Sequence, residues 1–142
     1  MLVPCPACDA RNRVPAARLG DRGKCGRCGV ALFRGEPLEL STARFDVHAT
    51  AELPLLVDFW APWCGPCRAM APTFAATAAE LEPRLRLAKV NTESEPAVAA
   101  RFGIRSIPTL ILFRQGVEMA RVSGSLPAAE LRRWIGQHIQ NA

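Results

Sequence analysis

Residues 55–67 read LLVDFWAPWCGPC, an apolar run followed at once by two cysteines three positions apart. The apolar run predicts a buried central strand, and the segment after it predicts the first turn of a helix. The free amides and the positive end of such a helix stabilise a thiolate. Cys64 is therefore the expected attacking sulfur, and Cys67, one turn further into the helix, the expected resolving sulfur.

The size and composition of the chain limit its class. Its 142 residues, 49% of them hydrophobic, suffice for one core of roughly 100 residues and a small appendage. We expect no membrane-spanning segment, and the first residues, MLVPC, lack the basic and apolar regions of a secretory signal. A cytoplasmic location is therefore expected. In a reducing compartment, six cysteines favour metal binding and catalysis over structural disulfides.

Four of the six cysteines form two matched pairs near the N-terminus. Cys5 pairs with Cys8 and Cys25 with Cys28, and sixteen residues separate the pairs. A segment this small cannot fold on hydrophobic burial alone. The spacing matches structural zinc sites with four thiolate ligands, so we predict one tetrahedral Zn²⁺ ion. Two disulfides or four free thiols are the alternatives.

The positive charge is concentrated in the same segment. Residues 1–35 carry seven Lys or Arg against two Asp, which accounts for the whole net charge of +5, whereas residues 36–142 contain eleven of each sign. A basic patch can bind nucleic acid, but four thiolates on Zn²⁺ contribute −2 and lower +5 to about +3. We therefore expect no nucleic-acid binding. We also expect two units with separate cores, a four-cysteine zinc-binding module at 1–35 and a second domain at 36–142.

Beyond the module, the sequence predicts alternating helices and strands. Gln115 and Gly116 mark the turn of a hairpin between the last two strands. The order implies an α/β fold in which a mixed central sheet is flanked by helices on both faces. The expected strands are residues 55–59, 85–91, 109–114 and 118–123, and the expected helices are residues 43–52, from the dithiol to 81, 97–102 and 128–140.

Residues 57–67, VDFWAPWCGPC, resemble the active-site segment of thioredoxins. Three further segments follow in the order of that family: AKVN at 88–91, FGIRSIPT at 102–109 and FRQG at 113–116. The likeness covers residues 40–142, and the N-terminal cysteine pairs resemble the zinc module of the bacterial thioredoxin 2 type. The resemblance implies a thioredoxin fold preceded by a small zinc-ribbon-like module.

The same resemblance implies a function and assigns site residues. A member of this family would be a monomeric protein disulfide reductase, re-reduced by thioredoxin reductase with electrons from NADPH and binding no organic cofactor itself. Disulfide-containing proteins would be its substrates. Cys64 matches the nucleophile and Cys67 the resolving cysteine. Asp58 matches the buried acid, Lys89 its neighbouring ammonium, and Pro108 the cis proline that faces the dithiol.

Asp58 is the one acid in the predicted central strand. Burial raises the pKa of such a carboxyl toward the range in which it can accept a proton. We expect Asp58 to act as general base for Cys67 through a water molecule. The alternative is that Asp58 only pairs with Lys89 and holds two strands together.

Several residues are expected to bind substrate. Gly65 and Pro66 preshape the helical turn between the two sulfurs, because Pro66 fixes φ near its helical value. A cis peptide before Pro108 would expose the Ile107 backbone, with which an extended substrate chain could pair by strand addition. Gly124 matches a surface loop of the family and would keep this platform flat.

The aromatic and histidine residues are less informative. Trp63, beside a cysteine expected to be exposed, should line the docking surface, whereas a core role and a functional role both stay open for Trp60. His48 and His138 lie in predicted helices without metal-ligand spacing. We expect both histidines to be ordinary surface residues.

Two other functions use the same features. In one, the basic module binds a protein or nucleic-acid partner, and the thioredoxin fold serves as a scaffold or holdase. In the other, oxidation of the module's cysteines releases the metal and makes the module a redox sensor. The intact dithiol of Cys64 and Cys67 favours the reductase over both.

Overall fold

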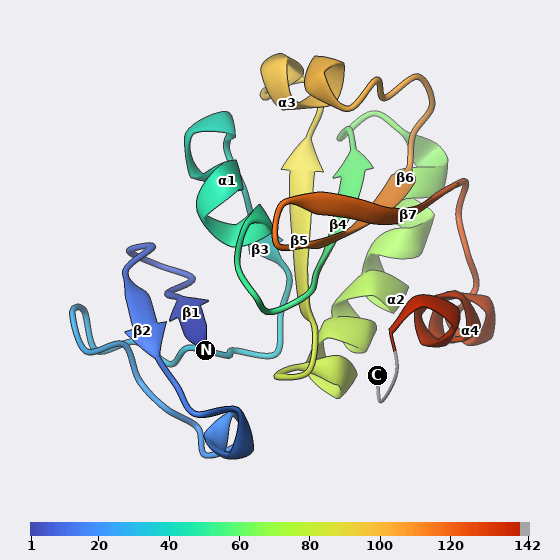
Figure 1. Ribbon diagram of the computed structural model, residues 1–142. Coiled ribbons are helices and arrows are strands. Elements are labelled where there is room, and N and C mark those ends of the chain that lie inside the picture. Colours follow the sequence, from blue (N-terminus) through green and yellow to red (C-terminus); the bar gives the residue numbers. More distant parts are fainter. Residues whose placement is uncertain (140–142) are drawn as a thin grey trace.

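The computed structural model describes residues 1–139 and contains one five-stranded sheet with the strand order β3-β5-β4-β6-β7 (Figure 1). β3, β5 and β4 pair in parallel, whereas β6 pairs with β4, and β7 with β6, in antiparallel orientation. The predicted mixed sheet is confirmed. Its strands are β3 (Leu38–Glu39), β4 (Leu55–Trp60), β5 (Arg86–Asn91), β6 (Thr109–Arg114) and β7 (Val117–Ser123).

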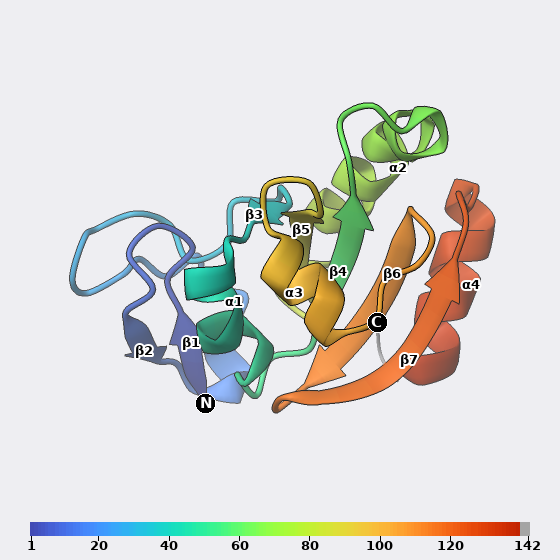
Figure 2. The ribbon, with the colours of Figure 1, turned by 90° about the horizontal axis from the view of Figure 1, so that it is seen from above.

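Helices cover both faces of this sheet (Figure 2). α1 (Thr42–Ala49) and α3 (Pro96–Arg101) pack on one face, and α2 (Gly65–Leu81) and α4 (Ala128–His138) on the other. Successive strand residues point to opposite faces. In β4, Val57 accordingly packs under α1 and α3, and Leu56 packs against α2 and α4. Asp58, two residues after Leu56, therefore faces α2.

The N-terminal segment has its own small core. β1 (Leu2–Pro4) and β2 (Arg11–Arg13) form an antiparallel pair, and a short 3₁₀ helix, η1 (Ala16–Arg18), follows. Cys5, Cys25 and Leu32 form a buried cluster that is distinct from the two clusters of the sheet. The segment lies beside α1 and near the β3 edge, away from the loop that joins β4 to α2 (Figures 1 and 2).

Two predicted elements differ from the observed ones. The predicted connection at 33–40 contains β3, because Leu38 and Leu40 are buried on either side of exposed Glu39, a pattern too short to identify from sequence. α1 ends at Ala49 instead of residue 52, because the carbonyl of Ala49 accepts a hydrogen bond from the amide of Gly116, 2.8 Å away in the β6–β7 turn.

The remaining boundaries agree with the prediction to within two residues over the described chain. Gln140, the predicted last residue of the final helix, lies outside the described residues. Within residues 1–139, no helix is long and apolar enough to cross a membrane.

Candidate functional site

The two cysteines of the dithiol lie at the start of α2. Cys64 is the N-cap residue of this helix, and Pro66 lies in its first turn. A disulfide joins Cys64 to Cys67, whose Cα atoms are 5.2 Å apart. The backbone amide of Cys67 also donates a hydrogen bond to Cys64 Sγ, 3.2 Å away. One sulfur thus lies where helix amides can stabilise a negative charge.

The exposure of the site differs from the sequence-based expectation. Cys64 is only 4% exposed and Cys67 only 2% exposed, whereas Trp63 is 69% exposed. The prediction that Cys64 is exposed is wrong for this oxidised form. The reason is that its sulfur is bonded to Cys67 and that the residue packs against Trp60 and Ile107. The exposed surface around the disulfide is formed by neighbouring residues such as Trp63.

A loop that is distant in sequence contacts the dithiol. The Ile107–Pro108 peptide is cis, as the resemblance implied. Cys64 Sγ lies 3.8 Å from the carbonyl oxygen of Ile107. The amide of Gly124 donates a 2.9 Å hydrogen bond to the carbonyl of Pro108. The fold therefore brings Ile107 next to Cys64, and a backbone hydrogen bond joins the Gly124 loop to Pro108.

Asp58 is buried on the α2 face of the sheet, two residues before the end of β4. The residue is 1% exposed, and neither carboxylate oxygen has a hydrogen-bond partner within residues 1–139. Burial raises the pKa of Asp58 to about 7, although the nearby positive charge of Lys89 opposes the shift. A carboxyl that titrates near neutral pH can accept a proton during a reaction.

Lys89 is next to Asp58 in the sheet but does not neutralise it directly. The two residues are register partners on β5 and β4. The ammonium of Lys89 lies 4.1 Å from the centre of the half-buried Trp60 ring, in a cation–π contact. A purely structural ion pair would join the two charges with hydrogen bonds. Within residues 1–139, no hydrogen bond joins the Asp58 carboxylate to Lys89.

The four N-terminal cysteines converge on one point. Their sulfur atoms all lie within 4.8 Å of one another, with Cys5 and Cys28 3.5 Å apart and Cys8 and Cys25 3.7 Å apart. A tetrahedron with Zn–S bonds of about 2.3 Å has sulfur atoms about 3.8 Å apart. None of the four cysteines forms a disulfide, so the alternative of two disulfides is wrong. The donor set and its spacing fit one tetrahedral metal ion.

Asn12 supports the second cysteine pair, a role that the sequence did not reveal. Its side-chain amide lies 3.5 Å from Cys25 Sγ, and its Oδ1 accepts a 2.9 Å hydrogen bond from the amide of Gly26. The side chain therefore fixes the loop that presents Cys25. A single asparagine in a three-residue polar strand, β2, carries no pattern that would identify it.

The prediction that His48 is a surface residue is wrong. His48 is 2% exposed, and its Nε2 lies 2.8 Å from Asp9 Oδ1. Burial lowers the pKa of His48 to about 4, so the ring is neutral at pH 7 and Nε2–H donates to the carboxylate. Arg44 donates three further hydrogen bonds to Asp9, two from Nε and one from Nη2, and one to the carbonyl of Pro6, at 2.7 Å. His138 is exposed, as predicted.

Arg86 attaches the N-terminal segment to the sheet at a second point, besides the contacts of Asp9 with Arg44 and His48 on α1. It is 3% exposed, and its guanidinium donates hydrogen bonds to the carbonyl of Pro4, at 2.6 Å, and to that of Leu32. The guanidinium also lies 4.9 Å from the centre of the Phe33 ring. Burial lowers the pKa of Arg86 to about 10, which leaves it charged at pH 7.

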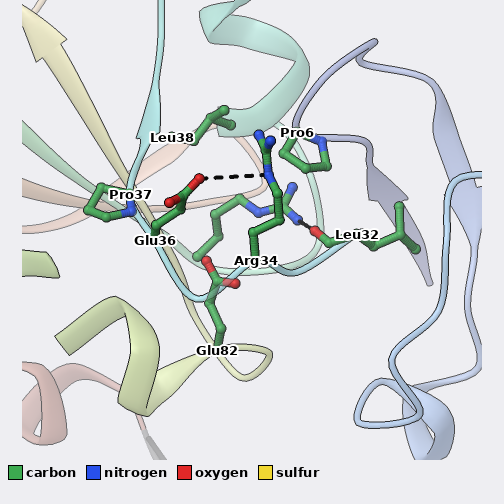
Figure 3. A pocket seen from close by; sticks show the side chains of 8 residues that line it. Pro6, Leu32, Arg34, Glu36, Pro37, Leu38 and Glu82 are labelled. Carbon is green, nitrogen blue, oxygen red and sulfur yellow. Dashed lines mark hydrogen bonds and ion pairs between the residues drawn. The ribbon is translucent and has the colours of Figure 1, made fainter. Parts of the chain in front are cut away.

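The seam around Arg86 is closely packed. Figure 3 shows Pro6 and Leu32 on one side of it and Leu38 and Glu82 on the other. The cavity between them measures about 10 Å³, no more than one water molecule requires. The two cores are therefore joined by buried contacts as well as by the connecting chain.

Comparison with known proteins agrees with these observations. Residues 36–137 match the family described as Thioredoxin. The chain belongs to the thioredoxin family. Residues 4–30 match the thioredoxin 2 N-terminal zinc ribbon. The chain is 44% identical over 141 residues to Thioredoxin C-3 of Corynebacterium nephridii, an alignment that covers 99% of this chain and 97% of that protein.

Two further relatives share the thioredoxin domain. A thioredoxin of Haemophilus influenzae is 42% identical over 105 residues, which cover 73% of this chain and 98% of that protein. The solved structure of a thioredoxin of Malassezia sympodialis superposes with a TM-score of 0.69 at 29% identity, over 74% of this chain and 92% of that one. This chain is therefore a thioredoxin-type disulfide oxidoreductase that carries an additional metal-binding module.

Proposed function

We propose that this member of the thioredoxin family is a general protein disulfide reductase. The observation that carries the proposal is the position of Cys64 at the N-cap of α2, in contact with the amide and the sulfur of Cys67. The thiolate of Cys64 attacks one sulfur of a substrate disulfide and displaces the other as a thiolate. Cys67, deprotonated, then attacks Cys64 Sγ, which releases the reduced substrate and leaves the Cys64–Cys67 disulfide.

The substrate binds on the surface around the disulfide. Trp63, Gly65 and Pro66 are exposed beside the two sulfurs. An extended substrate chain pairs with the Ile107 backbone, next to Pro108 and the Gly124 loop, by main-chain hydrogen bonds. Such bonds do not depend on side-chain identity, which fits a reductase of many proteins. The N-terminal module lies away from the β4–α2 loop (Figure 1).

The oxidised protein is re-reduced by an NADPH-dependent thioredoxin reductase, the electron donor that the family implies. The reaction takes place in the cytoplasm, where such a reductant keeps thiols reduced. One chain contains both sulfurs of the dithiol, so the proposed reaction needs no second copy, and we take the monomer as the acting unit.

The N-terminal module, residues 1–35, holds one structural zinc ion, and residues 36–142 form the thioredoxin domain. The ligands are Cys5, Cys8, Cys25 and Cys28, whose sulfurs fit a tetrahedral site. Metal analysis of the purified protein should give one zinc per chain, and a Cys25→Ser variant should bind it far more weakly. A protein that contains no zinc after expression with zinc in the medium would contradict this assignment.

Asp58→Asn is expected to slow the release of the mixed disulfide about 100-fold at pH 7, with little effect on its formation. The reason is that Asn cannot accept the proton of Cys67. Because the pKa of Asp58 is about 7, the wild-type release rate should fall as the pH falls through 7, and the variant should lack this step. Single-turnover kinetics with a fluorescent protein disulfide measure both rates. Equal slowing of both steps would contradict the role of Asp58 as base.

The same variant should stabilise the protein in a pH-dependent way. Asp58 has a higher pKa in the folded protein than in the unfolded chain, so the fold binds its proton more tightly. Ionisation of this carboxyl therefore lowers the free energy of unfolding, and the loss grows as the pH rises from about 4 to about 7. Asp58→Asn should raise the free energy of unfolding at pH 8 by about 2–4 kcal/mol, and by less at pH 5.5. Urea denaturation at both pH values tests this, and an equal effect at both would contradict it.

A further inference from the structure

A second carboxylate lies in line with Asp58 and Lys89. Glu39 on β3 is the register partner of Lys89 on β5, and Lys89 is the register partner of Asp58 on β4. Register partners in parallel strands project to the same face of a sheet. Leu38, next to Glu39, packs under α1 and α3, so Glu39 projects to the opposite face. The three charged side chains therefore form one row on the α2 face.

This row runs from solvent into the core. Glu39 is exposed, Lys89 is half-buried and Asp58 is 1% exposed. By strand order, Lys89 lies between the two carboxylates. Neighbouring strands are about 4.8 Å apart, which places the Glu39 and Asp58 backbones about 10 Å apart. The charge of Lys89 therefore acts on both acids at once.

Few other charges can influence Asp58. Its register partner on β6, Leu110, is apolar. Cys64 and Cys67 of α2 titrate only when the dithiol is reduced. Burial raises the pKa of Asp58, Lys89 opposes this shift and Glu39 adds to it. Within residues 1–139, the charged or titratable side chains of α2 and α4 outside the dithiol are all exposed: Arg68, Glu80, Glu130, Arg132, Arg133 and His138.

We propose that Glu39 is a positioning residue of the reductase, whose negative charge offsets that of Lys89 and sets the pH range in which Asp58 accepts the proton of Cys67. This inference rests on the proposed role of Asp58 as base. Without the charge of Glu39, Lys89 would stabilise ionised Asp58 more strongly. Asp58 would then stay ionised to lower pH and would be a weaker base.

Glu39→Gln tests this proposal. The pH midpoint of mixed-disulfide release should fall by roughly 0.5 to 1 unit, the shift expected from one charge about 10 Å away in a partly screened environment. Glu39→Asp keeps the charge and should keep the wild-type midpoint. Glu52→Gln removes the same charge from an exposed residue at the other end of β4 and should cause no shift. A midpoint unchanged in Glu39→Gln, or shifted equally in Glu52→Gln, would overturn the proposal.

Two controls separate this proposal from the proposed function. In an Asp58→Asn background, Glu39→Gln should shift no midpoint, because the base on which it acts is absent. A shift that persists there would show that Glu39 acts on another group, and would overturn the inference alone. Wild-type protein that releases no mixed disulfide, or Asp58→Asn with the wild-type pH profile, would overturn the role of Asp58 and the inference with it. Titration of the Asp58 carboxyl by NMR in reduced Glu39→Gln should show the same downward shift as the kinetics.

Discussion

Cys64→Ser is expected to lower the rate of protein disulfide reduction by at least about 1,000-fold. A serine hydroxyl is not ionised at neutral pH, and the amide of Cys67 that contacts this position cannot compensate for the lost thiolate. The rate can be measured with dithiothreitol as reductant, so that no partner enzyme is needed.

Cys67→Ser is the matched variant, because it keeps the attacking sulfur and removes the resolving one. It should form the mixed disulfide at nearly the wild-type rate and then stop, which makes the intermediate visible by mass spectrometry. If Cys64→Ser kept full activity, or if Cys64→Ser trapped substrates and Cys67→Ser did not, the assigned order of the two cysteines would be wrong.

Arg86→Met is expected to lower the free energy of unfolding by about 3 kcal/mol. Methionine fills part of the volume of the arginine side chain, but it donates no hydrogen bond. The carbonyls of Pro4 and Leu32, which accept from the buried guanidinium, would lose this partner at the seam. Urea denaturation followed by circular dichroism measures the loss.

Arg84→Met is the matched control, because Arg84 is exposed and lies two residues before Arg86. It should change the free energy of unfolding by less than about 0.5 kcal/mol. Deletion of residues 1–35 removes both acceptors of Arg86 and should destabilise the remaining domain as well. A truncated domain as stable as the full chain, together with a neutral Arg86→Met, would show that the module is attached only by its linker.

The sequence was most informative where local pattern and local chemistry coincide. The apolar run of β4, followed by Cys64 and Cys67, determines both a buried strand and a helix start from adjacent residues. The turn at Gln115 and Gly116 identified the β6–β7 hairpin in the same way. The cysteine spacing likewise predicted the cluster of four sulfurs, because thiolate ligands must converge on one ion.

The sequence was least informative where a residue's role depends on a distant partner. Arg86 is one arginine among many in the sequence, and its acceptor Pro4 lies 82 residues away. His48 becomes buried because Asp9, 39 residues away, packs against it. The low exposure of Cys64 likewise depends on Ile107, 43 residues further along the chain. Tertiary packing, and not local propensity, decides each of these cases.

The reactivity of the Cys64 sulfur tests the account most directly. In the reduced protein, the rate of Cys64 alkylation is measured against pH, with mass spectrometry to identify the labelled cysteine. We expect Cys64 to be labelled before Cys67. The pH midpoint of its alkylation should lie at least about one pH unit below the pKa of free cysteine, which is about 8.5. A midpoint equal to that of free cysteine, or a Cys64 that resists labelling while Cys67 reacts, would contradict the claim that helix amides hold Cys64 as the attacking thiolate.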